Sequence, residues 1–166
     1  MTKQDEEVFN RLFAEVNKDN KLNQMKAFIQ HGRVTTYDHV IDVARMSYRI
    51  NRKFHIGARE KELVRGALLH DYFLYDWHHW KWPLHGPYHP KAALENAKRD
   101  FDLTACEENI IRSHMWPLTL FHYPKTREAV IVCIADKIIS THETLFARGK
   151  KRARRRIRLR QQHEGK

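Results

Sequence analysis

The sequence predicts an all-α protein with a single domain. Its 166 residues are 42% hydrophobic, which is enough for one core and too little chain for two ordinary domains. Only six Gly and five Pro occur, and no segment shows the sustained alternation of apolar and polar residues that marks a strand. Apolar residues recur instead at helical spacing, so we expect a helical bundle.

Seven helices are expected, at about residues 4–18, 22–29, 37–54, 59–73, 90–99, 104–115 and 125–147. The first two carry apolar residues at helical spacing, and His31-Gly32 ends the second. Thr35 or Thr36 can cap the third helix, and His39 lies near its start.

Gly57 separates the third helix from the fourth, where His70 shares one face with apolar residues and therefore points inward. Residues 76–90 are expected to form a loop, because they hold three prolines and three of the four tryptophans. Pro90 then begins the fifth helix, since proline is favoured in a first turn.

The last two helices each bring one polar residue to an apolar surface. His114 lies in the last turn of the sixth helix, and Asp136 lies in the middle of the seventh. Asp136 shares a stripe with Ala129, Cys133, Ser140 and Glu143.

The net charge of +11 is concentrated near the C-terminus. Nine Lys or Arg and no acid lie between Arg148 and Arg160, which leaves +2 for the rest of the chain. We therefore expect a domain over residues 1–147 and a basic tail, helical or disordered, over residues 148–166. The tail can bind RNA, DNA or anionic lipid through phosphates, or it can be a solvated extension that improves solubility.

Composition also argues against several classes of protein. Cys106 and Cys133 have no CxxC spacing and read as reduced thiols, which excludes a disulfide framework and a zinc ribbon. No apolar run approaches the roughly 20 residues of a membrane span, and the N-terminus lacks a signal-peptide pattern. The expected location is the cytoplasm.

The pair His70-Asp71 is the most informative feature, because it ends an apolar helical run. An imidazole and a carboxylate buried there need partners, and a divalent cation satisfies both at once. Other candidate ligands lie on separate expected helices: His39, His89, His114 and Asp136.

This ordered set resembles the HD superfamily of metal-dependent phosphohydrolases, and within it small bacterial HD-domain proteins with little assigned function. The resemblance covers residues 34–143. It rests on Tyr37-Asp38-His39-Val40, Gly66-Ala67-Leu68-Leu69-His70-Asp71, His89-Pro90-Lys91-Ala92-Ala93-Leu94, Ser113-His114-Met115-Trp116-Pro117 and Ile134-Ala135-Asp136-Lys137.

The resemblance implies one or two divalent transition metals, with Fe, Mn, Zn, Co or Ni all suited to these ligands. His39, His70, Asp71 and Asp136 would hold one metal. His89 and His114 would hold a second, with Asp71 bridging the two. A metal-bound hydroxide would then attack a phosphomonoester or phosphodiester, of a nucleotide by family resemblance.

Many relatives place a Lys three residues after the Asp of the HD pair, where this chain has Leu74. A phosphate contact or an acid must then come from elsewhere. Asp76, Arg112 and Lys137 are the candidates for a catalytic role beside Asp71, together with Lys81, and Lys137 is expected to point away from the metals.

Several alternatives stay open. The His70-Asp71 pair could form an internal hydrogen bond, and Asp136 a buried salt bridge. His89 and His114 could support a single-metal site without binding a metal, and His85 competes with His89 as a ligand. The rival function is a catalytically weak, metal-containing binding module whose basic tail reaches nucleic acid. The oligomeric state is undetermined.

Aromatic residues cluster after the HD pair, at Tyr72, Phe73, Tyr75, Trp77, Trp80, Trp82 and Tyr88. They could roof a pocket and stack on a base. Packing over the core beside the site is the favoured interpretation.

Overall fold

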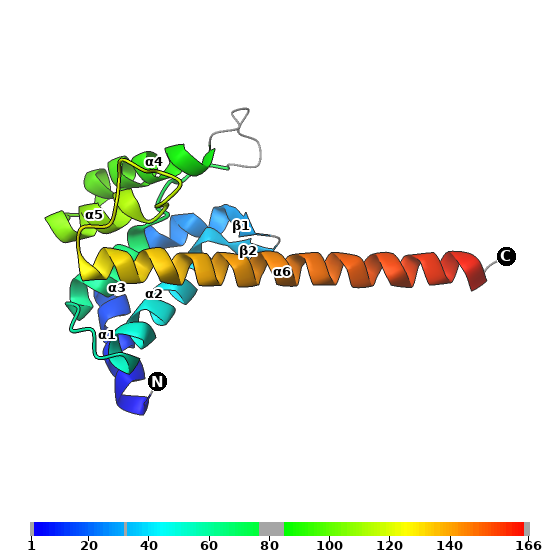
Figure 1. Ribbon diagram of the computed structural model, residues 1–166, viewed down its shortest axis with the longest axis horizontal. Coiled ribbons are helices and arrows are strands. Elements are labelled where there is room, and N and C mark those ends of the chain that lie inside the picture. The colour runs from blue at the N-terminus through cyan, green and yellow to red at the C-terminus, as the bar shows by residue number, and fades with distance from the viewer. Residues whose placement is uncertain (1, 32, 77–84, 165–166) are drawn as a thin grey trace.

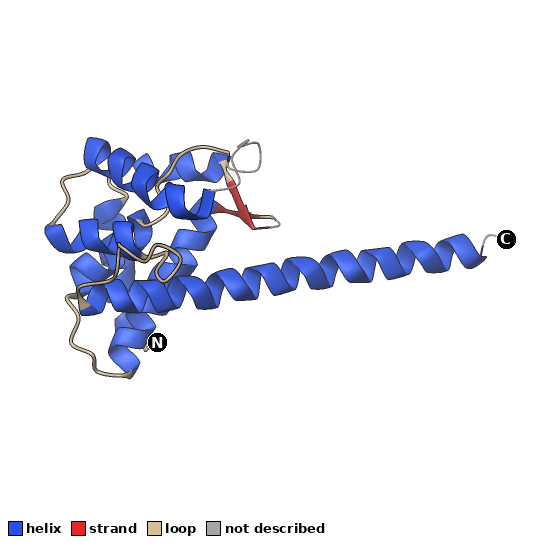
Figure 2. Ribbon diagram, turned by 45° about the horizontal axis from the view of Figure 1, so that its top comes forward, coloured by secondary structure: helices blue, strands red, loops and turns tan. Residues whose placement is uncertain are grey.

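Most residues are helical in the computed structural model, which describes residues 2–31, 33–76 and 85–164 (Figures 1 and 2). The all-α prediction is confirmed. The elements in chain order are α1 (Lys3–Val16), the 3-10 helix η1 (Lys21–Ala27), β1 (Ile29–His31), β2 (Val34–Thr35), α2 (Thr36–Lys53), α3 (Glu60–Leu69), α4 (His85–Asp100), α5 (Ala105–Ser113) and α6 (Arg127–Glu164).

Side-chain caps fix where three of the helices begin. Thr2 and Asp5 form a capping box at the start of α1, and Thr104 and Glu107 form another at the start of α5. At α2 the Thr35 hydroxyl accepts a hydrogen bond from the amide of Asp38, so Thr35 and not Thr36 is the N-cap.

The sequence did not indicate the short hairpin before α2. Residues 29–31 were expected to end a helix, but β1 pairs antiparallel with β2, with Ile29 opposite Thr35. The physical reason is that η1 ends at Ala27 and Phe28 is already extended. This hairpin brings Gln30 to the buried side of the molecule.

Three helix boundaries also differ from expectation. Helix α3 ends at Leu69 instead of residue 73, and α4 begins at His85 within the expected loop. Pro87 fits there because first-turn amides have no acceptor within the helix, whereas Pro90 lies inside the helix. Helix α6 continues past residue 147 through Glu164, so the basic tail takes the helical one of its two expected forms, and the helix extends beyond the other elements (Figure 1).

The core forms where α2, α3, α5 and the first half of α6 pack together. Gly66 of α3 allows the closest approach, because a Cβ there would lie 2.4 Å from Cδ1 of Ile110 in α5. The close contact holds the C-terminal ends of α3 and α5 together, and both ends carry predicted ligands. Among the helices of the described ranges, none has the length and apolar content needed to cross a bilayer.

Candidate metal centre

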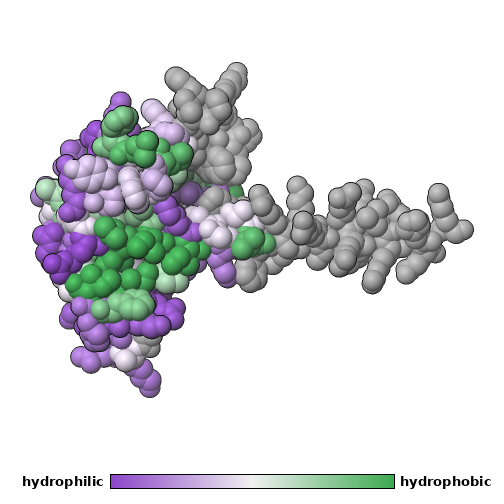
Figure 3. Space-filling view, in the orientation of Figure 1, coloured by the Kyte–Doolittle hydropathy of each residue, from purple (hydrophilic) through white to green (hydrophobic). Residues whose placement is uncertain are grey.

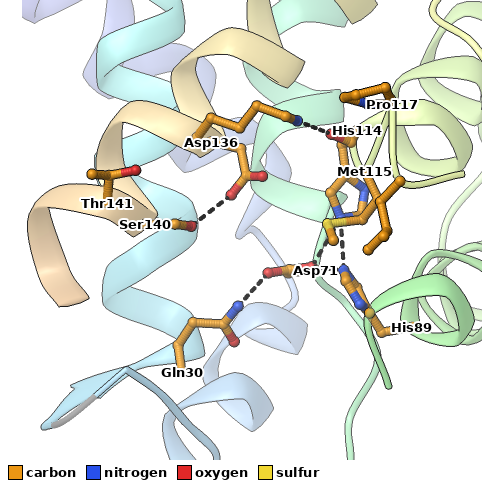
Figure 4. Close-up of a pocket in the computed structure, with 12 residues that line it drawn as sticks. Gln30, Asp71, His89, His114, Met115, Pro117, Asp136, Ser140 and Thr141 are labelled. Atoms are coloured by element: carbon orange, nitrogen blue, oxygen red, sulfur yellow. Dashed lines mark hydrogen bonds and ion pairs between the residues drawn. The ribbon is translucent and has the colours of Figure 1, made fainter. Parts of the chain in front are cut away.

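All six predicted ligands lie in one buried cluster. His39 comes from the first turn of α2, His70 and Asp71 from the end of α3, and His89, His114 and Asp136 from α4, the end of α5 and α6. None of the six side chains is more than 9% exposed. Figure 4 shows Asp71, His89, His114 and Asp136 pointing toward one another around a pocket.

Two of the histidines are oriented in the same way, by the helices that they end. Nδ1 of His70 donates a hydrogen bond to the carbonyl oxygen of Ala67 at 2.7 Å, and Nδ1 of His114 donates to that of Ile111 at 2.8 Å. A carbonyl can only accept, so the proton of each neutral ring sits on Nδ1. Nε2 is then the bare nitrogen, which is the form that binds a metal.

One group of donor atoms surrounds Nε2 of His39. This nitrogen lies 3.3 Å from Oδ1 of Asp136 and 3.7 Å from Oδ2 of Asp71. Nε2 of His70 lies 3.6 Å from the same Asp71 oxygen and 3.8 Å from the same Asp136 oxygen. Two imidazole nitrogens and two carboxylate oxygens, from α2, the end of α3 and α6, thus lie close together.

A second group surrounds the other oxygen of Asp71. Oδ1 lies 3.1 Å from Nε2 of His89 and 3.4 Å from Nε2 of His114. The two imidazole nitrogens are 2.8 Å apart. Asp71 therefore faces one pair of histidines with each carboxylate oxygen.

Polar atoms are left unsatisfied in this arrangement. Nε2 of His70 and Oδ1 of Asp71 are buried, and neither makes a hydrogen bond to any residue that the structure describes. A buried polar atom without a partner is costly. The cluster can hold a cation, because a cation would satisfy both atoms through the lone pairs that they present.

The charges in the cluster stabilise its carboxylates. Burial alone would raise the pKa of Asp71, but His70 and His89 hold it well below its usual value. Burial alone would also raise the pKa of Asp136. Hydrogen bonds with His39 and His70 outweigh this effect, so the pKa of Asp136 is lowered as well. Both side chains are therefore anionic near neutral pH, as metal ligands must be.

Three further residues hold the ligands in place. Nδ1 of His39 lies 3.2 Å from the carboxylate of Glu143, Nε2 of Gln30 donates to Oδ2 of Asp71 at 2.7 Å, and the Ser140 hydroxyl donates to Asp136 at 3.1 Å. Ser140 and Glu143 share the Asp136 stripe, so the helical period could have identified them. Gln30 carried no such signal, because only the unexpected hairpin brings it here.

The cluster borders a cavity of about 580 Å³. Gln30, Ser140 and Thr141 lie on one side, and Met115 and Pro117 lie on the other beside His89 and His114 (Figure 4). The lining residues are Gln30, Asp71, Gly86, His89, His114, Met115, Pro117, Leu118, Asp136, Lys137, Ser140 and Thr141. Pockets of this size accommodate small organic molecules.

The predicted catalytic residues do not all reach the cavity. Asp71 and Lys137 line it, and Nζ of Lys137 donates to the carbonyl oxygen of His114 at 2.9 Å. Lys137 thus lines the cavity, with its ammonium bound to a backbone carbonyl. Asp76 and Arg112 are exposed and are not among the described residues that line the cavity.

The residues that directly follow the HD pair pack against the core, whereas Tyr88 is 42% exposed. Leu74 is half-buried, and Tyr72 and Phe73 are buried core residues. The Phe73 ring lies 5.8 Å from that of His89, which supports the packing interpretation. Lys81, Trp77, Trp80, Trp82 and the His85 side chain fall outside the described residues.

Another set of potential ligands, Glu62, Cys106 and Glu128, lies apart from this cluster. Arg59 forms ion pairs with both glutamates of this set. Nε of Arg59 lies 2.6 Å from Glu62, and its amide donates to Glu128 at 2.9 Å. This set is therefore explained as a salt bridge.

Comparison with known proteins gives one match. The HD domain model matches residues 36–140, which is more than half of the chain and includes every member of the buried cluster. No curated protein and no solved structure matches the chain.

Proposed function

This chain belongs to the HD domain family, and from that premise we propose that it is a metal-dependent phosphohydrolase. The family consists generally of metal-dependent hydrolases, and the His and Asp cluster offers candidate metal sites. One observation carries the proposal: the two oxygens of Asp71 face two separate pairs of imidazoles.

The ligand sets follow from this division. His39, His70, Asp71 and Asp136 would hold one cation, and His89 and His114 would share Asp71 with a second. Imidazole and carboxylate donors suit Fe, Mn, Zn, Co or Ni. A bound pair of cations supplies a water of lowered pKa and neutralises the charge of a transferring phosphoryl group.

The chain's own residues would position the substrate. Asp71 and Asp136 stay ionised beside the cavity and keep the ligand set anionic. Ser140, Thr141 and Lys137 are polar lining residues of the cavity, where a phosphate ester can be oriented. Met115, Pro117 and Leu118 form the apolar wall, which suits the organic part of a phosphorylated small molecule. A nucleotide is the first class to test.

Metal analysis and turnover together test the proposal. Purified protein should contain divalent metal and release phosphate from an aryl phosphate or from members of a nucleotide panel. His70→Ala and Asp71→Ala should abolish release, and His142→Ala, which removes an exposed histidine of α6, should not. Equal rates in all four proteins would refute the assignment.

A second function is favoured by Leu74, which packs against the core where relatives carry a phosphate-contacting Lys. In this alternative the protein keeps its metal but serves as a binding module, with the basic tail reaching nucleic acid. Stoichiometric metal, no turnover on any phosphate ester and RNA binding lost on deletion of residues 148–166 would support it. Phosphate-ester turnover that survives this deletion would support the proposed phosphohydrolase function.

A further inference from the structure

An apolar surface lies exposed over the start of α6 and the segment that precedes it. Figure 3 shows hydrophobic residues gathered there, in the view that places α6 in front. Phe121 is 94% exposed. We define this exposed apolar surface by Leu118, Leu120, Phe121, Val130, Ile134 and Ile138.

Hydrogen bonds hold the two parts of this surface together. The thiol of Cys133 donates to the carbonyl oxygen of Trp116 at 3.2 Å, and Nζ of Lys137 donates to that of His114. The segment before α6 is therefore fixed against the helix. A fixed apolar patch of this kind on a protein surface commonly marks an interaction site.

The exposed apolar surface continues into the strongly basic part of the same helix. Val130, Ile134, Ile138 and Leu145 are exposed at helical spacing along α6. In the sequence Arg148, Arg152 and Arg156 follow Leu145 at steps of three, four and four. In the sequence the helical spacing of apolar residues is thus continued by arginines, and the segment from Arg148 to Arg160 has nine positive residues and no acid.

We propose that α6 and the exposed apolar surface dock this protein on an anionic lipid membrane. Such a membrane offers negative headgroups for the basic segment and a boundary with acyl chains for Leu120, Phe121 and Ile134. Tyr123 and Lys125, whose ammonium lies 5.6 Å from the ring centroid, have the amphipathic character that suits this boundary.

Charge and chemistry favour this occupant over two others. A second copy offers no net negative charge, because the chain outside Arg148–Arg160 carries a net +2. A nucleic acid offers phosphates, but aliphatic side chains such as Leu120, Val130 and Ile134 cannot stack on bases. The inference is independent of the proposed function, because docking is measured without turnover.

Vesicle co-sedimentation of the full-length protein tests the proposal. Phosphatidylcholine vesicles that contain phosphatidylserine should sediment the protein, and pure phosphatidylcholine vesicles should not. Phe121→Ser with Leu120→Ser should reduce the bound fraction by about tenfold, since two exposed apolar side chains no longer enter the lipid. Phe54→Ser, which removes another exposed ring at the end of α2, should bind as the parent protein does.

The basic segment has its own test. Replacement of Arg148, Arg152 and Arg156 by Gln should weaken binding to the anionic vesicles by about tenfold or more, and added salt should do the same. Lys91→Gln with Lys98→Gln, in α4, is the control. RNA binding without vesicle binding would overturn the proposal. A dimer that dissociates in the Phe121→Ser variant would also overturn it, if vesicles bind neither the parent protein nor the variant.

Discussion

Nε2 of His89 lies 2.8 Å from Nε2 of His114, and both nitrogens face Oδ1 of Asp71. Because the proton of His114 sits on Nδ1, the two rings and the carboxylate bring several lone pairs to one point. A cation bound between the two rings and the carboxylate would satisfy these lone pairs. This relationship separates a two-metal centre from a one-metal centre with two supporting histidines.

His114→Ala should lower the metal content from two ions per chain to one. His114 belongs only to the second group of donor atoms, so His39, His70 and Asp136 remain to hold the first ion. Elemental analysis of freshly purified protein measures the count. His122→Ala, outside the cluster, should keep both ions, and an unchanged count in His114→Ala would exclude His114 as a ligand.

Gln30→Met should weaken metal binding by about 10- to 100-fold, as is usual for a residue that orients a ligand. The substitution keeps the shape of the side chain but removes the amide that donates to Asp71. Thr36→Val should have a smaller effect, because the Thr36 hydroxyl bonds the carbonyl oxygen of Phe28 and Oε1 of Gln30, each at 3.3 Å, and acts on Asp71 through Gln30. Competition with a chelator measures both affinities. Wild-type affinity in Gln30→Met would show that this hydrogen bond does not matter.

Gly66→Ala should destabilise the fold by about 1–3 kcal/mol, because the new Cβ overpacks the contact of α3 with α5. The clash is with Cδ1 of Ile110 at 2.4 Å. Ile110→Val removes that atom, so the double variant should recover part of the stability that Gly66→Ala loses. Urea unfolding of the parent protein, the two single variants and the double variant gives the coupling free energy between the two positions. Simple additivity of the two changes would contradict the packing argument.

Asp100 should contribute stability that disappears in acid. A hydrogen bond from Arg99, joined by one from Tyr72 at 3.1 Å, lowers the pKa of Asp100 below its model-peptide value of 3.8. The contribution is therefore fully present above that value and is lost as the pH falls through the folded-state pKa. Asp100→Asn should cost stability at neutral pH and progressively less below pH 3.8.

Urea unfolding at a series of pH values compares Asp100→Asn with the parent protein. Asp102→Asn, which changes an exposed aspartate nearby in sequence, is the matched control. A difference between Asp100→Asn and the parent that stays constant with pH would mean that the Asp100 carboxylate does not titrate as described.

Helical spacing carried most of the information about the fold. Apolar residues at steps of three and four located α2 and α5 closely, and the threonine before α2 identified its cap. Spacing failed where short-range chemistry was ambiguous. Residues 29–31 fit a helix end and a strand equally well, and the prolines around α4 suggested a loop that the chain does not form at residues 85–90.

The sequence alone determined the helical class, the HD family and the six side chains that gather in the buried cluster, because periodicity and residue type are local properties. Tertiary structure alone decided that Asp71 divides its two oxygens between two histidine pairs, and that Gln30 supports it. Those relationships depend on how the ends of α3 and α5, the hairpin and α6 meet, and no spacing within one helix specifies a distance between helices.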